Sequence, residues 1–416
     1  MKKILWMIYG QGGRMVFQTF YFLLLAVVLG PTDYGAFVIV SSILIILGPF
    51  CGMGFNSILT RDISAGKNNF PELFGSAIKV TFYSYFCLLL IGEFIILLIF
   101  GNENNYGIIA LMFLILSVAD LFFLKLNEMS AQIYIAKNYV KRASHIFNFI
   151  SLSRFLSVFS IFLFANSENA MLIMWVITYF AFSLILSIVV YIGTLRKVES
   201  PVFSIPLKMS QLKEGVFFSI GLSSQGVYND IDKTLLGRFE SANVTGHYGF
   251  AYKVLDVLFI PVKAILALTF PMFFKVGEKE GVYGTYRLAK KVLIPLFFYC
   301  IASVIIAYYF FPIIIELVFP AYTDSIKYFT LLLPIVVLRV FHYVFADALT
   351  GAGFQKERSY VQIFIAVFNF LLSFILILTF SIYGAIYASL ISDALMLLTI
   401  SLLLLKKVKN EKSRNI

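Results

Sequence analysis

The sequence predicts an all-α polytopic membrane protein with twelve transmembrane helices. Of the 416 residues, 60% are hydrophobic and only 13% are charged, which leaves too little polar surface for a soluble domain. Apolar runs of about twenty residues, long enough to cross a hydrocarbon core as helices, recur from end to end. Basic residues are confined almost entirely to alternate connections between these runs.

Clusters of polar residues, Gly and Pro separate the twelve predicted spans. The first span follows Lys2 and Lys3, as in a signal peptide, but it continues to Gly30 without a small-residue cleavage site. We therefore expect an uncleaved first span, and we expect Pro261 to kink span eight. The spans run near 7–29, 35–58, 74–100, 106–133, 143–165, 170–193, 216–237, 246–273, 290–314, 327–350, 359–379 and 383–405.

The connections alternate in charge. One set, which includes the N-terminus and the connection with Lys275 and Arg287, is rich in Lys and Arg, whereas the alternate set contains only Arg238 and Lys327. Because cytoplasmic loops carry the excess of basic residues, both termini are predicted to lie in the cytoplasm. The net charge of +11 therefore belongs to juxtamembrane clusters that contact anionic lipid headgroups, and a nucleic-acid partner is not expected.

Neither an enzyme nor a bound cofactor is expected. No connection is long enough to form a soluble catalytic domain, and a polymerase or ligase would need a sizeable periplasmic loop. Cys51, Cys87 and Cys300 lie in apolar runs without the spacing of metal ligands, which argues against a metal or a disulfide. The glycines of YGQGG (9–13) follow no predicted strand, which argues against a nucleotide-binding loop.

A short motif indicates two six-helix halves. Tyr34–Gly35 opens span two and Tyr248–Gly249 opens span eight, so each stands in the second span of its half. Such a layout is common among transporters, with the substrate path between the halves. The predicted domains are an N-terminal lobe (1–194), a cytoplasmic inter-lobe linker (195–215), a C-terminal lobe (216–405) and a basic cytoplasmic tail (406–416).

Three stretches carry a resemblance to a known family: LGPTDYGAF (29–37), GMGFNSILTRDIS (52–64) and IDKTLLGRFESANVTGHYGFAYKV (231–254). Together with the twelve-span layout, they resemble the polysaccharide transporters of the multidrug/oligosaccharidyl-lipid/polysaccharide (MOP) superfamily. Within that superfamily, length and motif style most resemble the Wzx-type O-antigen flippases.

The resemblance implies two six-helix lobes in a MATE-like V shape that encloses a polar cavity. It implies a flippase that carries an undecaprenyl-pyrophosphate-linked oligosaccharide, such as an O-antigen repeat unit, by alternating access. The cargo would move from the cytoplasmic to the periplasmic leaflet of the bacterial inner membrane. The implied partners are membrane lipids and the polysaccharide polymerase and glycosyltransferases of the same pathway.

Polar and charged side chains inside the spans form the candidate site, because a charge at membrane depth normally faces a cavity or a partner. Arg and Lys can compensate a pyrophosphate, and amides and hydroxyls can replace water around sugars. In span seven, polar residues recur at spacings of three and four from Ser219 to Lys233, which places them on one helix face. The candidate substrate-binding residues are Arg14, Gln18, Asn56, Arg154, Ser223, Asn229, Lys233, Lys253 and Arg339.

Three carboxylates of spans seven and eight, Asp230, Asp232 and Asp256, are candidates for proton or sodium coupling. A carboxylate beside a cavity can titrate between conformational states. The structural alternative is a local ion pair, since Asp230 and Lys233 lie three residues apart on one helix.

The basic residues of the spans also have structural alternatives. Arg154 and Arg339 lie near the middle of spans five and ten, where each could form a buried ion pair with Asp120 or Asp393. Lys125 is close enough to a cytoplasmic end for its ammonium to reach the interface by snorkelling.

A cation-coupled small-molecule or drug antiporter of MATE type is the alternative function. Such an antiporter would favour an acid-lined cavity, whereas basic residues within these spans are at least as frequent as acidic ones. The sequence therefore favours the flippase.

Overall fold

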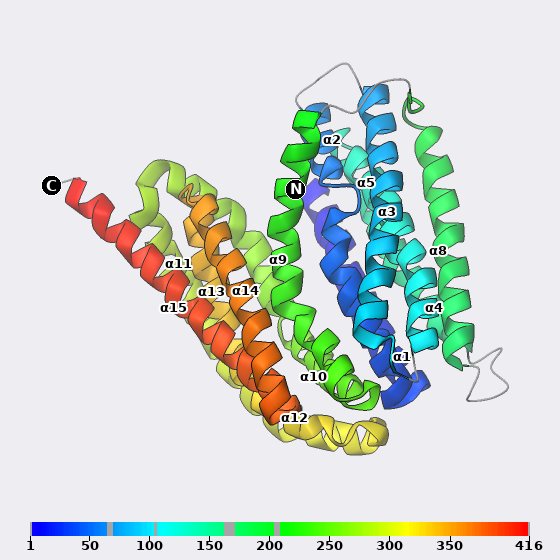
Figure 1. Ribbon diagram of the computed structural model, residues 1–416. Coiled ribbons are helices and arrows are strands. Elements are labelled where there is room, and N and C mark those ends of the chain that lie inside the picture. Colours follow the sequence, from blue (N-terminus) through cyan, green and yellow to red (C-terminus); the bar gives the residue numbers. More distant parts are fainter. Residues whose placement is uncertain (1, 65–69, 104–105, 162–170, 204–208, 415–416) are drawn as a thin grey trace. The chain divides into compact units, whose positions relative to one another are not determined.

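The computed structural model describes residues 2–64, 70–103, 106–161, 171–203 and 209–414, and within these ranges its regular structure is helical, with no strand. The chain divides into two compact units, residues 1–226 (unit 1) and 227–416 (unit 2). Helix α9 (Met209–Phe239) belongs to unit 1 up to Gly226 and to unit 2 beyond it. In Figure 1, long helices run alongside one another in each unit.

Unit 1 begins with a helix that covers the first predicted span and the second as far as Leu47, where a turn interrupts the rest of that span. Gly30 lies inside α1 with φ 69° and ψ 174° and is followed by Pro31. Glycine adopts positive φ without a steric penalty, and proline has no N–H to continue the hydrogen-bond ladder, so α1 kinks there. The helices of unit 1 are α1 (Lys2–Leu47), α2 (Phe55–Ser64), α3 (Phe70–Phe100), α4 (Tyr106–Ser117), α5 (Leu124–Ala136), α6 (Val140–Phe159), α8 (Met171–Leu195) and the first part of α9.

Unit 2 has two similar breaks. The chain bends at Phe259, directly before Ile260 and Pro261 begin the next helix, which confirms the predicted kink of span eight. Further on, Gly281 has φ 63° and kinks α11 between the predicted spans eight and nine. The helices are the end of α9, α10 (Ala242–Leu258), α11 (Ile260–Val318), α12 (Ser325–Leu332), α13 (Pro334–Gly351), α14 (Gln355–Phe380) and α15 (Ile382–Arg414).

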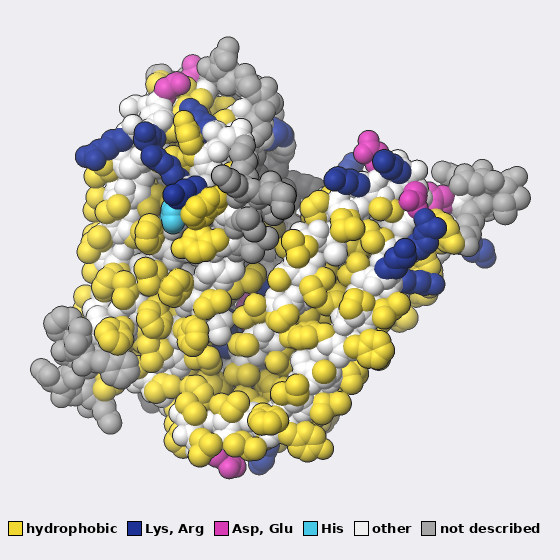
Figure 2. Space-filling view, turned by 180° about the vertical axis from the view of Figure 1, so that it is seen from behind, with side chains coloured by type: hydrophobic (Ala, Val, Ile, Leu, Met, Phe, Trp, Pro, Cys, Tyr) yellow, Lys and Arg dark blue, Asp and Glu magenta, His cyan; other side chains and the backbone are white. Residues whose placement is uncertain are grey.

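Once α1 and α11 are divided at their kinks, the helices follow the twelve predicted spans in chain order, which confirms the predicted fold class. Eight helices among the described residues are long and apolar enough to cross a membrane. On the face shown in Figure 2, hydrophobic side chains cover the length of the helices, and many Lys and Arg side chains gather near helix ends. Helices α6 and α9 are more polar and carry several candidate site residues.

Close packing of α1 against α6 shapes the interior of unit 1. A Cβ atom on Gly13 would lie 2.2 Å from Asn148 Oδ1, and one on Gly10 would lie 2.8 Å from Ser144 Cα. Ser144 Oγ also donates to the carbonyl of Trp6 at 2.6 Å. Small residues permit such an approach between membrane helices, so Gly10 and Gly13 of YGQGG serve helix packing.

The predicted inter-lobe linker is described only in part. Helix α8 ends at Leu195, and Val202 donates its N–H to the carbonyl of Pro71 at 2.9 Å. Residues 204–208 of the linker lie outside the described residues, as does the predicted outer connection ANSENA (165–170).

Candidate functional site

Unit 1 contains a cavity of about 250 Å³ between its helices. Charged, amide and apolar side chains share its lining, an unusual mixture for the interior of a membrane protein. It is lined by residues of α1, α2, α5, α6 and α9 and of the turn between α1 and α2: Arg14, Pro49, Cys51, Gly54, Asn56, Lys125, Glu128, Gln132, Phe147 and Leu222.

Helix α5 supplies a polar wall of this cavity. Lys125, Glu128 and Gln132 are spaced by three and four residues, which places them on one helix face. The helix follows directly on a π-helical turn, Val118–Phe123. Such turns are rare and frequently occur at functional sites, since the extra residue in the turn re-aims the side chains that follow.

Arg14 reaches the cavity from α1. The neighbouring Gly13 lets α1 approach α6 closely at Asn148. The guanidinium carbon of Arg14 lies 5.9 Å from the centre of the Phe147 ring on α6, within the range of a cation–π interaction. The glycine contact and the aromatic ring therefore hold this cation at the cavity wall.

Asn56 reaches the cavity from the first turn of α2. The turn before α2 has positive φ at Gly52 (75°), Met53 (42°) and Gly54 (66°), and Gly52 donates its N–H to Ser84 Oγ at 2.8 Å. Positive φ at a residue other than glycine often accompanies function. The Oδ1 atom of Asn56 is buried and has no hydrogen-bond partner among the described residues. It can therefore accept a hydrogen bond from a ligand hydroxyl or a water.

The charges of the cavity form one connected group. Lys125 Nζ donates to Glu128 Oε2 at 3.0 Å, and Arg14 Nη2 lies 3.9 Å from Glu128 Oε1. The side chains of Lys125, Glu128 and Arg14 are 21%, 23% and 26% exposed, so water and a ligand can reach them. Two cations against one carboxylate leave a local excess of positive charge, which favours an anionic ligand.

Arg14 and Asn56 were among the residues predicted from sequence, whereas Lys125, Glu128 and Gln132 were not. The predicted snorkelling of Lys125 is replaced in the structure by its contact with Glu128 on the cavity wall. The spacing of the three residues on one face of span four was a signal of the same kind as the one used for span seven.

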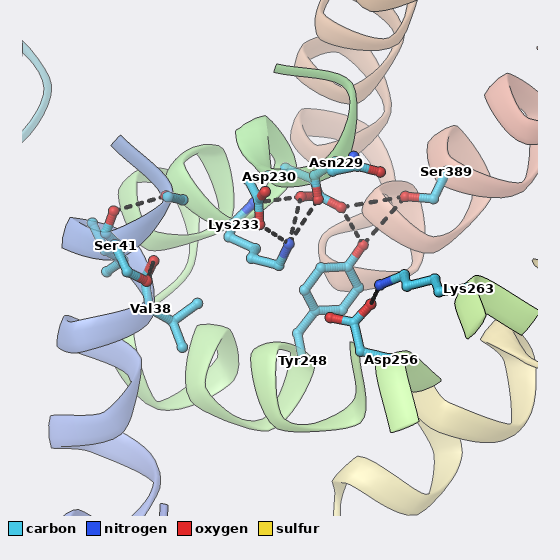
Figure 3. Close-up of polar contacts among 12 residues, drawn as sticks. Val38, Ser41, Asn229, Asp230, Lys233, Tyr248, Asp256, Lys263 and Ser389 are labelled. Atoms are coloured by element: carbon cyan, nitrogen blue, oxygen red, sulfur yellow. Dashed lines mark hydrogen bonds and ion pairs between the residues drawn. The ribbon is translucent and has the colours of Figure 1, made fainter. Parts of the chain in front are cut away.

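A second polar group lies in unit 2 at the end of α9. Lys233 Nζ donates to Asp230 Oδ1 at 2.5 Å and to the carbonyl of Asn229 at 2.7 Å (Figure 3). It also lies 4.7 Å from the centre of the Tyr252 ring. The Lys233 side chain is only 6% exposed. The local ion pair between Asp230 and Lys233 is therefore formed, and the Lys233 ammonium has hydrogen-bond partners within its own helix.

Asp232 is also enclosed by partners. Tyr248 OH donates to its Oδ2 at 2.5 Å, Ser389 Oγ donates to the same oxygen at 3.3 Å, and the backbone N–H of Lys233 donates to Oδ1 at 2.8 Å. These contacts join α9, α10 and α15 within unit 2. By contrast, Asp256 is 49% exposed and pairs at 3.8 Å with Lys263. Lys253 is partly buried on α10.

Arg154 forms the buried ion pair that is the structural alternative to a substrate-binding role. Its Nη2 donates to Asp120 Oδ1 at 2.5 Å, and Tyr179 OH donates to the same carboxylate oxygen. The guanidinium carbon lies 6.0 Å from the centre of the Tyr179 ring. The contacts join α6, α8 and the π-helical turn before α5 within unit 1.

Arg339 has a comparable partner in unit 2. Its Nε lies 3.2 Å from both carboxylate oxygens of Asp393, and the two side chains are 8% and 1% exposed. His342 Nε2 lies 3.3 Å from Asp393 Oδ1, and Tyr228 OH donates to the same oxygen. The contacts of both arginines fit a structural role at least as well as a substrate-binding role.

The remaining two candidates lie on α9 and α1. Ser223 Oγ donates to the carbonyl of Ile46 at 2.8 Å, a hydrogen bond that links α9 to the end of α1. Gln18 lies one turn beyond Arg14 and is partly buried, outside the set of residues that lines the cavity.

The two helical units, with charged groups held among their helices, define a multi-pass membrane protein with the fold of MOP-superfamily transporters. The chain belongs to the polysaccharide biosynthesis protein family, whose sequence model matches residues 1–276. The resemblance drawn from the sequence is thereby confirmed. No curated protein matches the chain at a significant level.

Solved structures share the fold at low sequence identity. An inward-facing multidrug resistance MATE family transporter of the MOP superfamily is 15% identical with a TM-score of 0.79, over 94% of this chain and 96% of that chain. The lipid II flippase MurJ, in an inward closed conformation, is 14% identical with a TM-score of 0.76, over 95% of this chain and 86% of that chain. A MOP superfamily transporter from Pyrococcus furiosus is 14% identical with a TM-score of 0.64, over 96% and 94%. The solved structures that share this fold are those of transporters and of a flippase.

Proposed function

We propose that this protein flips an undecaprenyl-pyrophosphate-linked oligosaccharide and that the cavity of unit 1 receives the pyrophosphate and the adjoining sugars. The observation that carries the proposal is the pair of cations, Arg14 and Lys125, on one polar cavity in a member of a polysaccharide biosynthesis family. Pyrophosphate and sugars are the parts of such a lipid that hydrocarbon excludes, so they need a polar path, whereas the prenyl chain can remain in the bilayer.

Each polar residue of the cavity has a role in this proposal. Arg14 offers a planar fork that matches phosphate oxygens, and Lys125 offers a compact point charge. Asn56 Oδ1 accepts a hydrogen bond from a sugar hydroxyl, which would satisfy an oxygen that lacks a partner among the described residues. Gln132, whose Oε1 lies 3.4 Å from Thr60 Oγ1, adds a second amide on the same wall.

The proposal extends to direction and location. The basic connections favour cytoplasmic termini in a bacterial inner membrane, so the cargo would be loaded from the cytoplasmic leaflet and released to the periplasmic leaflet. An O-antigen repeat unit or a related surface polysaccharide unit is the cargo that the motifs favour. The polymerase and the glycosyltransferases of the same pathway would then act on either side of this step.

Reconstitution tests the proposal directly. Proteoliposomes containing the full chain and a fluorescent undecaprenyl-pyrophosphate oligosaccharide should expose the label to a membrane-impermeant quencher faster than protein-free liposomes. Arg14→Gln and Lys125→Gln should each slow this exposure while leaving the protein abundant in the membrane. A wild-type chain that moves no lipid, or two Gln variants with wild-type rates, would show the proposal to be wrong.

A cation-coupled antiporter of small molecules is the second candidate, and the likeness to the MATE family transporter is the observation that supports it. The cavity of unit 1 argues against it, since Glu128 is its one acid against two bases. Drug uptake into proteoliposomes under an imposed proton or sodium gradient decides between the two. Gradient-driven uptake without lipid movement would favour the antiporter.

A further inference from the structure

Glu128 occupies an unusual position in the cavity of unit 1. Its two carboxylate oxygens face different cations: Oε2 accepts from Lys125 at 3.0 Å, while Oε1 lies 3.9 Å from Arg14 Nη2. The cations come from different helices, α5 and α1. A bound pyrophosphate would bridge the same two cations in the same way, through separate oxygens.

The two contacts differ in strength. At 3.0 Å the contact with Lys125 is a charge-assisted hydrogen bond, whereas 3.9 Å is too long for a hydrogen bond to Arg14. An incoming anion can therefore engage the Arg14 fork first, without breaking a hydrogen bond to Glu128. It can then compete for Lys125 with a carboxylate that carries a single negative charge.

A purely structural role for Glu128 would be a helix-surface ion pair with Lys125, three residues away. Such a pair accounts for Lys125 but not for the approach of Arg14 from another helix. It also does not explain why all three side chains line one cavity and are each about one-quarter exposed.

We propose that Glu128 is an internal counter-anion that holds Arg14 and Lys125 in place in the empty cavity and competes with the substrate pyrophosphate for them. This inference rests on the proposed function, and it adds a positioning residue that sets the balance between binding and release. When the carboxylate occupies the cations, the competent fraction of the site falls and the apparent affinity falls in proportion. At release, the same carboxylate recaptures the cations and prevents the pyrophosphate from rebinding.

The variant Glu128→Gln tests this competition, because it keeps the shape and removes the charge. The full chain in lipid nanodiscs would be titrated with farnesyl pyrophosphate, a soluble prenyl pyrophosphate probe, and flipping would be measured in proteoliposomes. E128Q should bind the probe about tenfold more tightly, as expected if the carboxylate occupies the cations about nine-tenths of the time. Its KM for the lipid-linked oligosaccharide and its maximal flipping rate should both fall.

The matched control is Glu357→Gln, which removes a carboxylate paired at 2.8 Å with Lys407 on unit 2, outside the cavity. This control should bind and flip as the wild type does. If E128Q is not recovered as a folded protein, Glu128→Asp replaces it: the shorter side chain should also bind more tightly than the wild type, by a smaller factor.

The possible failures can be told apart. A wild-type chain that does not bind the probe contradicts the proposed function itself. Normal wild-type binding with equal or weaker binding by E128Q, or by E128D where that is the folded variant, contradicts the competition. A lower KM with an unchanged maximal rate contradicts the role in release, since loss of charge alone then accounts for the tighter binding.

Discussion

Glu411, near the end of α15, accepts a hydrogen bond from the backbone N–H of Tyr283 at 2.7 Å, and its other carboxylate oxygen accepts from Val282 at 3.1 Å. These two N–H groups open the second part of α11, directly after the kink at Gly281. The first N–H groups of a helix lack partners within it, and a carboxylate there is favoured by the helix dipole. The predicted cytoplasmic tail therefore caps the helix that begins at the kink.

Removing this cap should loosen the tail. Glu411→Ala is expected to lower the stability of unit 2 by about 1 kcal/mol, the usual cost of losing a helix N-cap. Gly281→Ala should have a comparable or larger effect, because alanine is strained at a φ of 63° and its Cβ would displace the Glu411 carboxylate. Protease cleavage in the tail, followed over time in membranes, measures the change. Cleavage at the wild-type rate in both variants would show that the contact does not hold the tail.

The ion pair of Arg339 and Asp393 should govern the abundance of the protein. Replacing Arg339 with Gln strands a buried carboxylate, which typically costs about 3–5 kcal/mol, so the variant should be scarce in the membrane. Adding Asp393→Asn should restore much of the abundance, because the unpaired charge is then removed. Immunoblots of membranes, read beside flipping, check this. Normal abundance with lost flipping in the single variant would instead place Arg339 on the substrate path.

The three acids of α9 and α10 should separate into two groups when each is replaced by Asn. Asp232 has three partners and Asp230 holds Lys233, so D232N and D230N should lower abundance. Asp256 is 49% exposed, so D256N should fold normally and reports on coupling alone. Flipping under imposed proton and sodium gradients is the measurement. Unchanged gradient dependence in D256N would remove Asp256 from coupling.

Topology should follow the distribution of basic residues. Reporter fusions after the outer connections GNENN (101–105) and ANSENA (165–170) should read periplasmic. Fusions after Arg142 and Lys213 should read cytoplasmic, since these connections belong to the basic set. A periplasmic signal from a fusion at Lys213 would contradict the predicted inter-lobe linker and the orientation of both lobes.

The sequence was sufficient for the number and order of the helices, because span length and polar breaks are local properties. It was less informative about connections. The boundary at Gly30 was expected to be a loop, yet α1 continues through Pro31 with only a kink, because the positive φ of Gly30 turns the chain at a single residue. The break before Pro261 was predictable because proline cannot continue the hydrogen-bond ladder.

The candidate site was predictable only in part. Spacing shows which polar residues share a helix face, but it does not show what that face contacts. The face that carries Lys233 is largely satisfied by neighbours, and the sequence named Asp120 and Asp393 as possible partners of the buried arginines without choosing between the alternatives. The face of α5 with Glu128 lines the cavity, although its charges also suited snorkelling.

The contact between α1 and α6 also sets an order of events during synthesis. Ser144 and Trp6, which it joins, are 138 residues apart, so α1 is translated long before its partner. Before α6 is inserted, α1 lies in the bilayer without its partner, and Arg14 and the face that carries Gly10 and Gly13 are not packed against another helix. A charge in hydrocarbon is costly, so transient neighbours or the insertion machinery must shelter this helix. We therefore expect the nascent chain to be most exposed to quality-control proteolysis until its fifth span, α6, has been inserted.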